Sequence, residues 1–201
     1  MVGIYNTDTE TGKVTRYNSG GQHILTTEHD NTGHTLYSEP YFITENNNGD
    51  IIVSDLLRRA VVVTERGGKH RFSYTGPPSG SPLAPRGVCT DALSHILVCD
   101  VNTDTVQVIG KDGHFLSLLL TQQHGEKSPR SLNYDDENHF LWVGSRWTNT
   151  VSVYRYIQRR YSLTDYPDSV EEDTREESDS DDQDARGEAD PKTCCQRCIL
   201  V

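Results

Sequence analysis

The chain has 201 residues, of which 33% are hydrophobic and 24% are charged, and its formal net charge is -11 at neutral pH. Most of the excess charge lies at one end, because residues 1–157 have a net charge of -4 and residues 158–201 have a net charge of -7. No apolar run is long enough to span a membrane, and the N-terminal residues lack the basic and apolar regions of a signal peptide. Only two cysteines, Cys89 and Cys99, precede residue 194. Both fall in or beside predicted strands, where buried free thiols are common, so we expect a reducing, cytoplasmic location.

Residues 1–39 contain short β-type runs at 3–5, 14–17 and 23–27, with turn residues between them. The run at 3–5 resembles the end of the second strand in the four-stranded units that follow. We therefore expect this segment to begin inside a repeating unit, with the opening strand of that unit missing.

Residues 40–84 form the first whole unit, with predicted strands at 40–44, 51–55, 60–64 and 70–75. Turn-forming residues separate these strands, including the Asn-Asn-Asn-Gly sequence at 46–49. In the third strand, Val61 and Val63 alternate with Val62, which is the period of two expected of a β-strand. The segment 76–82 is rich in glycine and proline but lacks the Lys-Ser/Thr ending of a phosphate loop, so it is predicted to connect two units.

The same pattern returns in residues 85–128 and 129–164. Pro40, Pro85 and Pro129 open the three units at intervals of 45 and 44 residues. A fixed period of this length, filled with four short strands, is typical of β-propeller blades. The sequence therefore predicts an all-β fold: a partial propeller over residues 1–164 with three four-stranded blades and part of a fourth, in units 1–39, 40–84, 85–128 and 129–164. The last strand of the final unit is expected at 158–163.

Three stretches of the repeats, Gly12–Tyr17, Thr44–Asp55 and Arg71–Gly76, carry a family resemblance. They resemble the NHL-repeat C-terminal region of tripartite-motif proteins, particularly the expanded invertebrate set. The resemblance covers about three-quarters of the chain. It implies a six-bladed propeller that selects a protein or RNA target for a RING-type ubiquitin ligase, with RING, B-box and coiled coil upstream.

The chain departs from this family pattern in three ways. No Cys/His series of the RING or B-box type occurs before residue 158. The repeats amount to three blades and a fragment, so we expect open propeller edges and self-association. Finally, Gly144-Ser145 stand where the other units have Asp55 and Asp100.

Propeller geometry turns the repeat into a surface prediction, because loops between second and third strands share one face with the loops that link blades. This face, here called the arginine face, collects seven candidate binding residues: Arg58, Arg59, Arg86, Arg130, Arg146, Trp147 and Tyr41. Arginine supplies planar, bidentate donors and tryptophan a stacking surface, a combination used for single-stranded RNA. A protein partner would instead use Trp147 or Tyr41 as an apolar anchor. The opposite face is expected to be acidic, relieved only by Arg66, Lys69 and Lys111.

Simpler interpretations of these residues stand beside the functional ones. Loops on repeat scaffolds are polar because they contact water, and a domain that is not basic is a weak electrostatic match for nucleic acid. Asp55 and Asp100 are expected to be turn residues that accept backbone hydrogen bonds. His23, His70 and His114 occur once per blade and are expected to be structural, so no metal, cofactor or catalytic residue is predicted.

The preferred function is a non-catalytic recognition module that resembles the substrate-binding propeller of tripartite-motif ubiquitin ligases. The alternative is a free-standing RNA-binding or protein scaffold propeller without a role in ubiquitination. A propeller-type enzyme is the third hypothesis, and it would require acids or histidines that converge at the channel mouth.

Residues 165–201 are predicted to be a disordered acidic tail with a Cys-rich end, because a charged, apolar-poor segment cannot bury enough surface to offset its chain entropy. Ser178 and Ser180 lie in an acidic context suited to phosphorylation. Cys198 has the position of a prenylation site, with Cys194 and Cys195 as candidate palmitoylation sites, although a final valine is unusual for prenylation. A membrane partner is expected only if Cys198 is prenylated.

Overall fold

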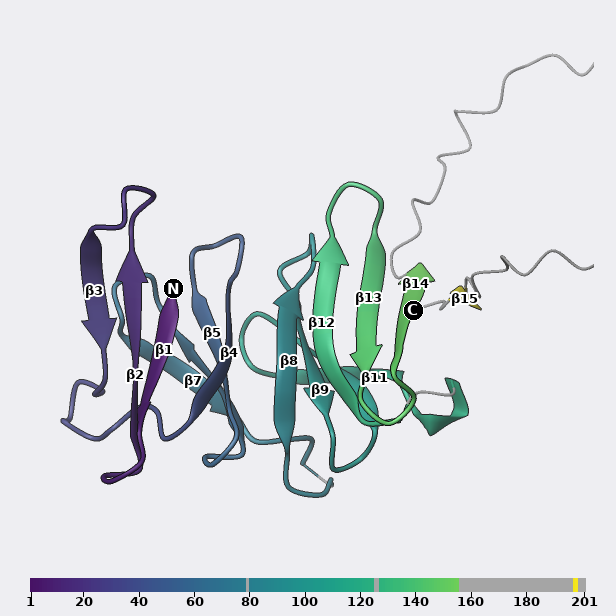
Figure 1. Ribbon diagram of the computed structural model, residues 1–201, viewed down its shortest axis with the longest axis horizontal. Helices are drawn as coiled ribbons and strands as arrows, with labels where there is room; N and C mark the ends of the chain where they lie inside the picture. Colours follow the sequence, from purple (N-terminus) through teal and green to yellow (C-terminus); the bar gives the residue numbers. More distant parts are fainter. Residues whose placement is uncertain (79, 125–126, 156–196, 199–201) are drawn as a thin grey trace, which may run out of the picture.

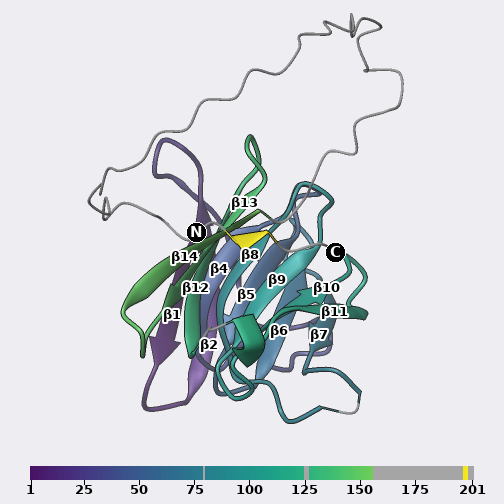
Figure 2. The ribbon, with the colours of Figure 1, turned by 90° about the vertical axis from the view of Figure 1, so that its right-hand side faces the viewer.

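The structure is a computed structural model that describes residues 1–78, 80–124, 127–155 and 197–198. The described elements are β-strands, apart from one short 3-10 helix, η1 (Gln122–His124). They form four sheets, which stand side by side in chain order from the N-terminal sheet to the C-terminal one (Figure 1). Figure 2 looks along this row from the C-terminal side. No helix in these described ranges is long and apolar enough to cross a membrane.

Each of the first three sheets is an antiparallel meander. The first contains β1 (Val2–Asn6), β2 (Thr11–Tyr17) and β3 (His23–Thr27). The second contains β4 (Pro40–Glu45), β5 (Ile51–Asp55), β6 (Ala60–Thr64) and β7 (His70–Tyr74). The third contains β8 (Pro85–Thr90), β9 (Ile96–Asp100), β10 (Thr105–Ile109) and β11 (Phe115–Leu120). These bounds confirm the strands predicted from the 45-residue period.

The fourth sheet contains β12 (Pro129–Asp135), β13 (Phe140–Ser145) and β14 (Thr150–Arg155). Its fourth member is β15 (Arg197–Cys198), which pairs with β14 in the parallel direction. The sequence analysis predicted the last strand of this unit at 158–163 and assigned residues 197–198 to the disordered tail. The structure instead pairs residues 197–198 with β14, so the prediction is corrected for these two residues. The predicted strand at 158–163, the predicted disorder of the rest of the tail, and Ser178, Ser180, Cys194 and Cys195 lie outside the described residues.

The core lies between neighbouring sheets rather than within one layer. Val61 and Val63 belong to a buried cluster between the second and third sheets, and Val62 belongs to the cluster between the first and second. Successive valines of β6 therefore point to opposite faces of the sheet, as predicted. Both faces are buried, because a neighbouring sheet packs on each of them. Burial of each aliphatic side chain contributes about 1.5–3 kcal/mol, so these layers hold adjacent blades together.

The first sheet begins with the second strand of a blade, as the sequence predicted. Strand β1 packs against β4 in the same way that β5 packs against β8 and β9 packs against β12. It therefore takes the place of the second strand of a blade, and the described part of the first sheet contains no inner strand.

The far side of the fourth sheet continues the packing pattern of a blade interface. Trp142 and Val151 occupy the positions at which the second sheet buries Ile52 and Val61, yet their exposures are 44% and 66%. No described residue covers this apolar face, which is the open end expected for a partial propeller.

Candidate functional site

The inner strand of each whole blade contains a β-bulge at the same position. Pro40, Pro85 and Pro129 pair with the ends of β5, β9 and β13, and the inner strand then has one residue more than its partner before regular pairing resumes. A bulge re-aims the side chains beside it. Tyr41, Arg86 and Arg130 each follow one of these prolines and therefore lie at equivalent positions of three successive blades.

Buried aspartates hold the loops of the arginine face in place. The Asp55 carboxylate accepts hydrogen bonds from the backbone N–H groups of Ser38, Glu39 and Arg58, at 2.6, 3.0 and 3.0 Å. Asp100 accepts one from the backbone of Ala84 at 3.0 Å. Both aspartates are fully buried, so their predicted role as turn residues is confirmed. Their carboxylates satisfy backbone donors and do not project from the arginine face.

The fourth blade has the same loop connection although serine replaces the aspartate. Arg146 donates its backbone N–H to the carbonyl of Ser128 at 3.1 Å, as Val101 does to Ala84 and Leu56 to Glu39 in the earlier blades. This bond fixes the start of the loop between β13 and β14. The side chain of Arg146 consequently leaves the sheet next to Arg130.

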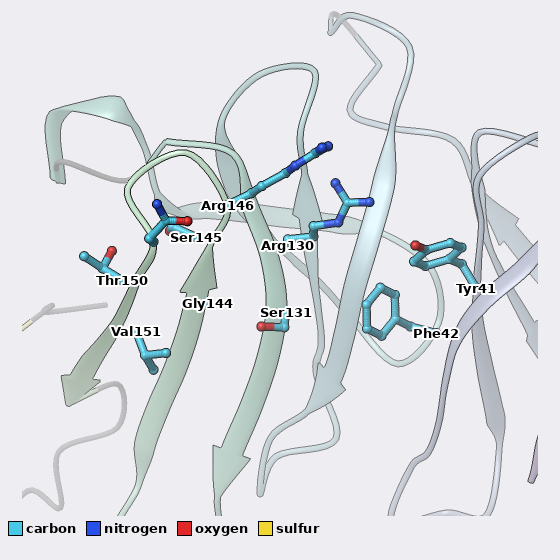
Figure 3. Close-up of a pocket in the computed structure, with 10 residues that line it drawn as sticks. Tyr41, Phe42, Arg130, Ser131, Gly144, Ser145, Arg146, Thr150 and Val151 are labelled. Atoms are coloured by element: carbon cyan, nitrogen blue, oxygen red, sulfur yellow. The ribbon is translucent and has the colours of Figure 1, made fainter.

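A pocket of about 460 Å³ lies on the arginine face between β4 and the end of the fourth sheet. Figure 3 shows the Arg130 and Arg146 side chains extending over it, with the Tyr41 hydroxyl directed towards Arg130 from the other side. The lining residues are Tyr41, Phe42, Arg130, Ser131, Gly144, Ser145, Arg146, Asn149, Thr150 and Val151. None of these lining residues is acidic, so the pocket combines cations, hydrogen-bonding groups and apolar surface.

Arginine and tyrosine interact directly beside this pocket. The Arg86 guanidinium carbon lies 4.8 Å from the centre of the Tyr41 ring, within the range of a cation–π contact. Arg130, as hydrogen-bond donor and as positive charge, lowers the pKa of Tyr41, and Arg86 lowers it further. The Arg86 Nε atom is buried and has no hydrogen-bond partner among the described residues. The site therefore holds positive charge that the protein has not fully satisfied.

The arginines at the pocket differ from Arg16 and Arg71, which have carboxylate partners. Arg16 forms an ion pair with Glu45 at 2.8 Å, and Arg71 pairs with Asp50 and Asp112. The ion pairs found in the described ranges include none with Arg86, Arg130 or Arg146. Because they form no ion pair, these cations remain available to an external anion.

The structure brings together four of the seven predicted residues, namely Tyr41, Arg86, Arg130 and Arg146. Arg58 instead donates a hydrogen bond to the carbonyl oxygen of Thr35, and Arg59 is an exposed turn residue with φ of 53°. Trp147 is 72% exposed and lies 5.6 Å from the Arg146 guanidinium carbon, at the edge of the pocket rather than inside it.

Sequence reasoning missed several lining residues, and it misjudged the opposite face. Ser131, Asn149 and Thr150 supply polar groups to the pocket, but their types and spacing give no functional signal. The opposite face was expected to have only Arg66, Lys69 and Lys111 as cations. This was wrong, because Arg16 and Arg71 reach its acids from neighbouring strands.

Two of the three histidines predicted to be structural, His23 and His70, have local side-chain partners, whereas His114 is exposed and shows no side-chain hydrogen bond within the described ranges. The His23 ring bonds the Thr26 hydroxyl at 2.9 Å and the His70 ring bonds the Ser73 hydroxyl at 3.0 Å, the same contact in two blades. Within the described ranges, no group of three or more His, Cys, Asp or Glu side chains is placed to hold a metal ion.

Comparison with solved structures supports the architecture. A protein provisionally assigned as a gluconolactonase is similar over 71% of this chain and 45% of its own length, with 20% identity and a TM-score of 0.53. A protein of unknown function from Bacteroides caccae is similar over 67% of this chain and 48% of its own, with 13% identity and a TM-score of 0.51. The fold is that of a β-propeller.

Other comparisons add little beyond the fold. Virginiamycin B lyase from Staphylococcus aureus, in an inactive variant with quinupristin, is similar over 77% of this chain and 59% of its own, at 13% identity and a TM-score of 0.49. The chain thus spans about half the length of the propellers that it matches. No protein-family model matches it, and a search of curated proteins found no match.

Proposed function

We propose that this chain is a recognition module that binds a target on its arginine face and does not itself catalyse a reaction. The observation that carries the proposal is the convergence of Tyr41, Arg86 and Arg130 from equivalent bulges of three blades, joined by Arg146 at the pocket. Buried or clustered arginines and aromatic side chains dominate binding energy at recognition sites. A pocket lined by cations without carboxylates or imidazoles offers binding groups but few for proton transfer.

In this proposal the chain acts in the cytoplasm as the substrate-binding propeller of a tripartite-motif ubiquitin ligase. The repeat phrase of the sequence supports that assignment, and the buried thiols of Cys89 and Cys99, which are not joined in a disulfide, fit a reducing compartment. The target is a protein or an RNA. A propeller that binds its target without any ubiquitination is the alternative. A propeller-type enzyme is the third hypothesis, since one similar structure is provisionally assigned as a gluconolactonase.

The recognition role is tested by photo-crosslinking from the edge of the pocket. A photoreactive amino acid at Trp147 should capture a discrete protein or RNA from cells that express the full chain. The double variant Arg130→Glu and Arg146→Glu should lose this product, whereas Arg155→Glu, which changes another arginine of the same sheet, should keep it. Identical products from all three proteins would refute recognition by this face.

The ligase assignment has a separate test. The full-length native transcript should encode a RING and a B-box upstream of these repeats. A native protein without them would exclude the ligase role but leave the recognition role intact.

We also propose that the exposed end of the fourth sheet mediates self-association of this chain. Trp142 and Val151 present there the apolar pattern that other blades bury. Sedimentation of the full chain should give a mass above 22.6 kDa, and Trp142→Lys, which leaves the residues lining the pocket unchanged, should reduce it. Leu118→Lys is the matched control, because Leu118 is also exposed but lies on β11 of the third sheet. A monomer at every concentration would contradict the proposal.

A further inference from the structure

We propose that the pocket lined by Tyr41, Arg130 and Arg146, with Arg86 stacked on Tyr41 beside it, binds the phosphate group of a phosphorylated serine or threonine in a peptide. This inference rests on the proposed recognition function and names the chemistry that the site recognises. It follows from the number of unpaired guanidinium groups, the polar groups on the pocket wall, and the charge of the surrounding domain.

The number of arginines matches a phosphate monoester better than a carboxylate. Arg86, Arg130 and Arg146 come from the third and fourth blades and form no ion pair that the structure records in its described ranges. A phosphoserine has three acceptor oxygens and a charge of about -1.5 to -2 at neutral pH. A carboxylate offers two oxygens and a single charge, which one bidentate arginine satisfies.

Groups beside the two lining arginines add charge and hydrogen-bond donors to the site. Arg86 does not line the pocket and its Nε atom is buried, so it contributes through its positive charge. Its guanidinium lies over the Tyr41 ring, which orients the planar group at the edge of the pocket. The hydroxyl side chains of Ser131 and Thr150 line the same pocket and can donate further hydrogen bonds.

The surroundings favour a peptide over a nucleic acid. Each internal phosphate of RNA is a single negative charge, and nucleic-acid binders normally spread many cations along a surface. Here two arginines line one pocket and a third lies beside it, and residues 1–157 have a net charge of -4. Phe42, Val151 and the exposed Trp147 provide apolar surface around the pocket, where side chains next to a phosphoserine can pack. Recognition of phosphorylated motifs by arginine clusters is a recurrent binding mode.

The phosphoserine has two candidate sources, a partner protein or this chain itself. Ser178 and Ser180 lie in the sequence Glu-Glu-Ser-Asp-Ser-Asp-Asp, which is suited to phosphorylation. The ligand chemistry is the same in both cases, so the experiment separates the two sources by peptide sequence.

The test measures binding of fluorescent peptides to the full 201-residue chain by anisotropy. One peptide carries a single phosphoserine in a Gly/Ala/Ser background, and its partners carry serine or glutamate at that position. A fourth peptide spans residues 174–184 with phosphoserine at 178 and 180. We expect the phosphoserine peptide to bind roughly 10-fold or more tightly than the serine peptide, since hydrogen bonds to charged groups are stronger than neutral ones.

The variants identify the site. Arg130→Gln and Arg146→Gln should each weaken phosphopeptide binding by roughly 10-fold, and Arg130→Lys should recover part of the loss because it restores charge without the bidentate geometry. Arg155→Gln should bind as the unchanged protein does. Arg146 is exposed, so its variant is expected to fold even if Arg86→Gln does not, and circular dichroism checks each fold.

The outcomes distinguish the two proposals. Equal binding of serine and phosphoserine peptides, tighter binding of a single-stranded RNA of matched length, or unchanged binding by Arg146→Gln would overturn phosphate recognition. If phosphopeptides fail but Arg130→Glu with Arg146→Glu still abolishes the photo-crosslink, the recognition function stands without phosphate. Tighter binding of the 174–184 peptide than of the neutral phosphopeptide supports the chain's own tail as the source, and weaker binding supports a partner.

Discussion

Replacement of Asp100 by alanine should destabilise the propeller strongly, because this carboxylate satisfies four donors at the junction of two blades. It accepts hydrogen bonds from the backbone of Ala84 at 3.0 Å and of Asn102 at 3.1 Å. It also accepts them from the Thr103 hydroxyl at 2.8 Å and the Gln107 amide at 3.0 Å. The side-chain oxygen of Gln107 in turn accepts a hydrogen bond from the Tyr74 hydroxyl of the preceding blade at 2.7 Å.

The magnitude follows from which donors water can reach after the substitution. Asn102 is exposed and Thr103 is half-buried, so both can be rehydrated. Gln107 is buried, and the backbone of Ala84 is part-buried beneath the connecting loop. Each donor left unsatisfied costs about 1–3 kcal/mol, so two of them predict a loss of about 2–6 kcal/mol for Asp100→Ala.

Urea unfolding of the full chain, followed by far-UV circular dichroism, measures this loss. Thr103→Val is the matched control, because it removes only one of the four donors and should cost about 1 kcal/mol. Unfolding slopes should be alike for the two variants, since the surface exposed on unfolding is unchanged. A loss below about 1 kcal/mol for Asp100→Ala, or one no larger than that of Thr103→Val, would refute the claim that this carboxylate holds the blade junction.

Three smaller predictions concern the arginine face and its loops. Gly87→Ala should lower the free energy of unfolding in urea by about 1–3 kcal/mol, because the added Cβ would lie 2.6 Å from the Ser131 Cα. A change near zero would mean that β8 and β12 can move apart to accommodate the methyl group. Arg130→Gln should raise the pKa of Tyr41 towards its ordinary value, as followed by ultraviolet absorbance with Tyr41→Phe as the reference; an unchanged titration would remove Arg130 as the cause. The hydrogen bond from the Thr32 hydroxyl lowers the pKa of Asp30 to about 2, so this interaction stabilises the fold above about pH 4 and is lost as the pH falls towards 2. Thr32→Val should raise that pKa in an NMR titration, and no rise would contradict the assignment.

The equivalent residues of different blades show where repetition in the sequence is informative. Asp55 and Asp100 recur at one position, and both proved to accept backbone hydrogen bonds from the loop that enters their blade. Ser145 takes that position in the fourth blade, yet the backbone bond between Arg146 and Ser128 persists. The turn therefore depends on the backbone geometry of the blade, and the aspartate reinforces it.

Local patterns in the sequence were enough to predict the strands, their phase within the blades and the all-β class. Hydrophobic alternation and turn residues act over a few positions, and the 45-residue period repeats that local information in each unit. It also placed the arginines on one face, because loop order in a propeller decides which face each loop occupies.

Which of those arginines lie together depends on the folded structure and could not be predicted from the sequence. Arg58 and Arg130 look alike in the sequence, but Arg58 bonds the carbonyl of Thr35, whereas a bulge beside Arg130 directs it to the pocket. Likewise, Arg71 appears as an ordinary strand residue until the packing of blades brings it to Asp112, 41 positions away. Such contacts depend on the register of paired strands and on the packing between blades, and both are properties of residues that are distant in the chain.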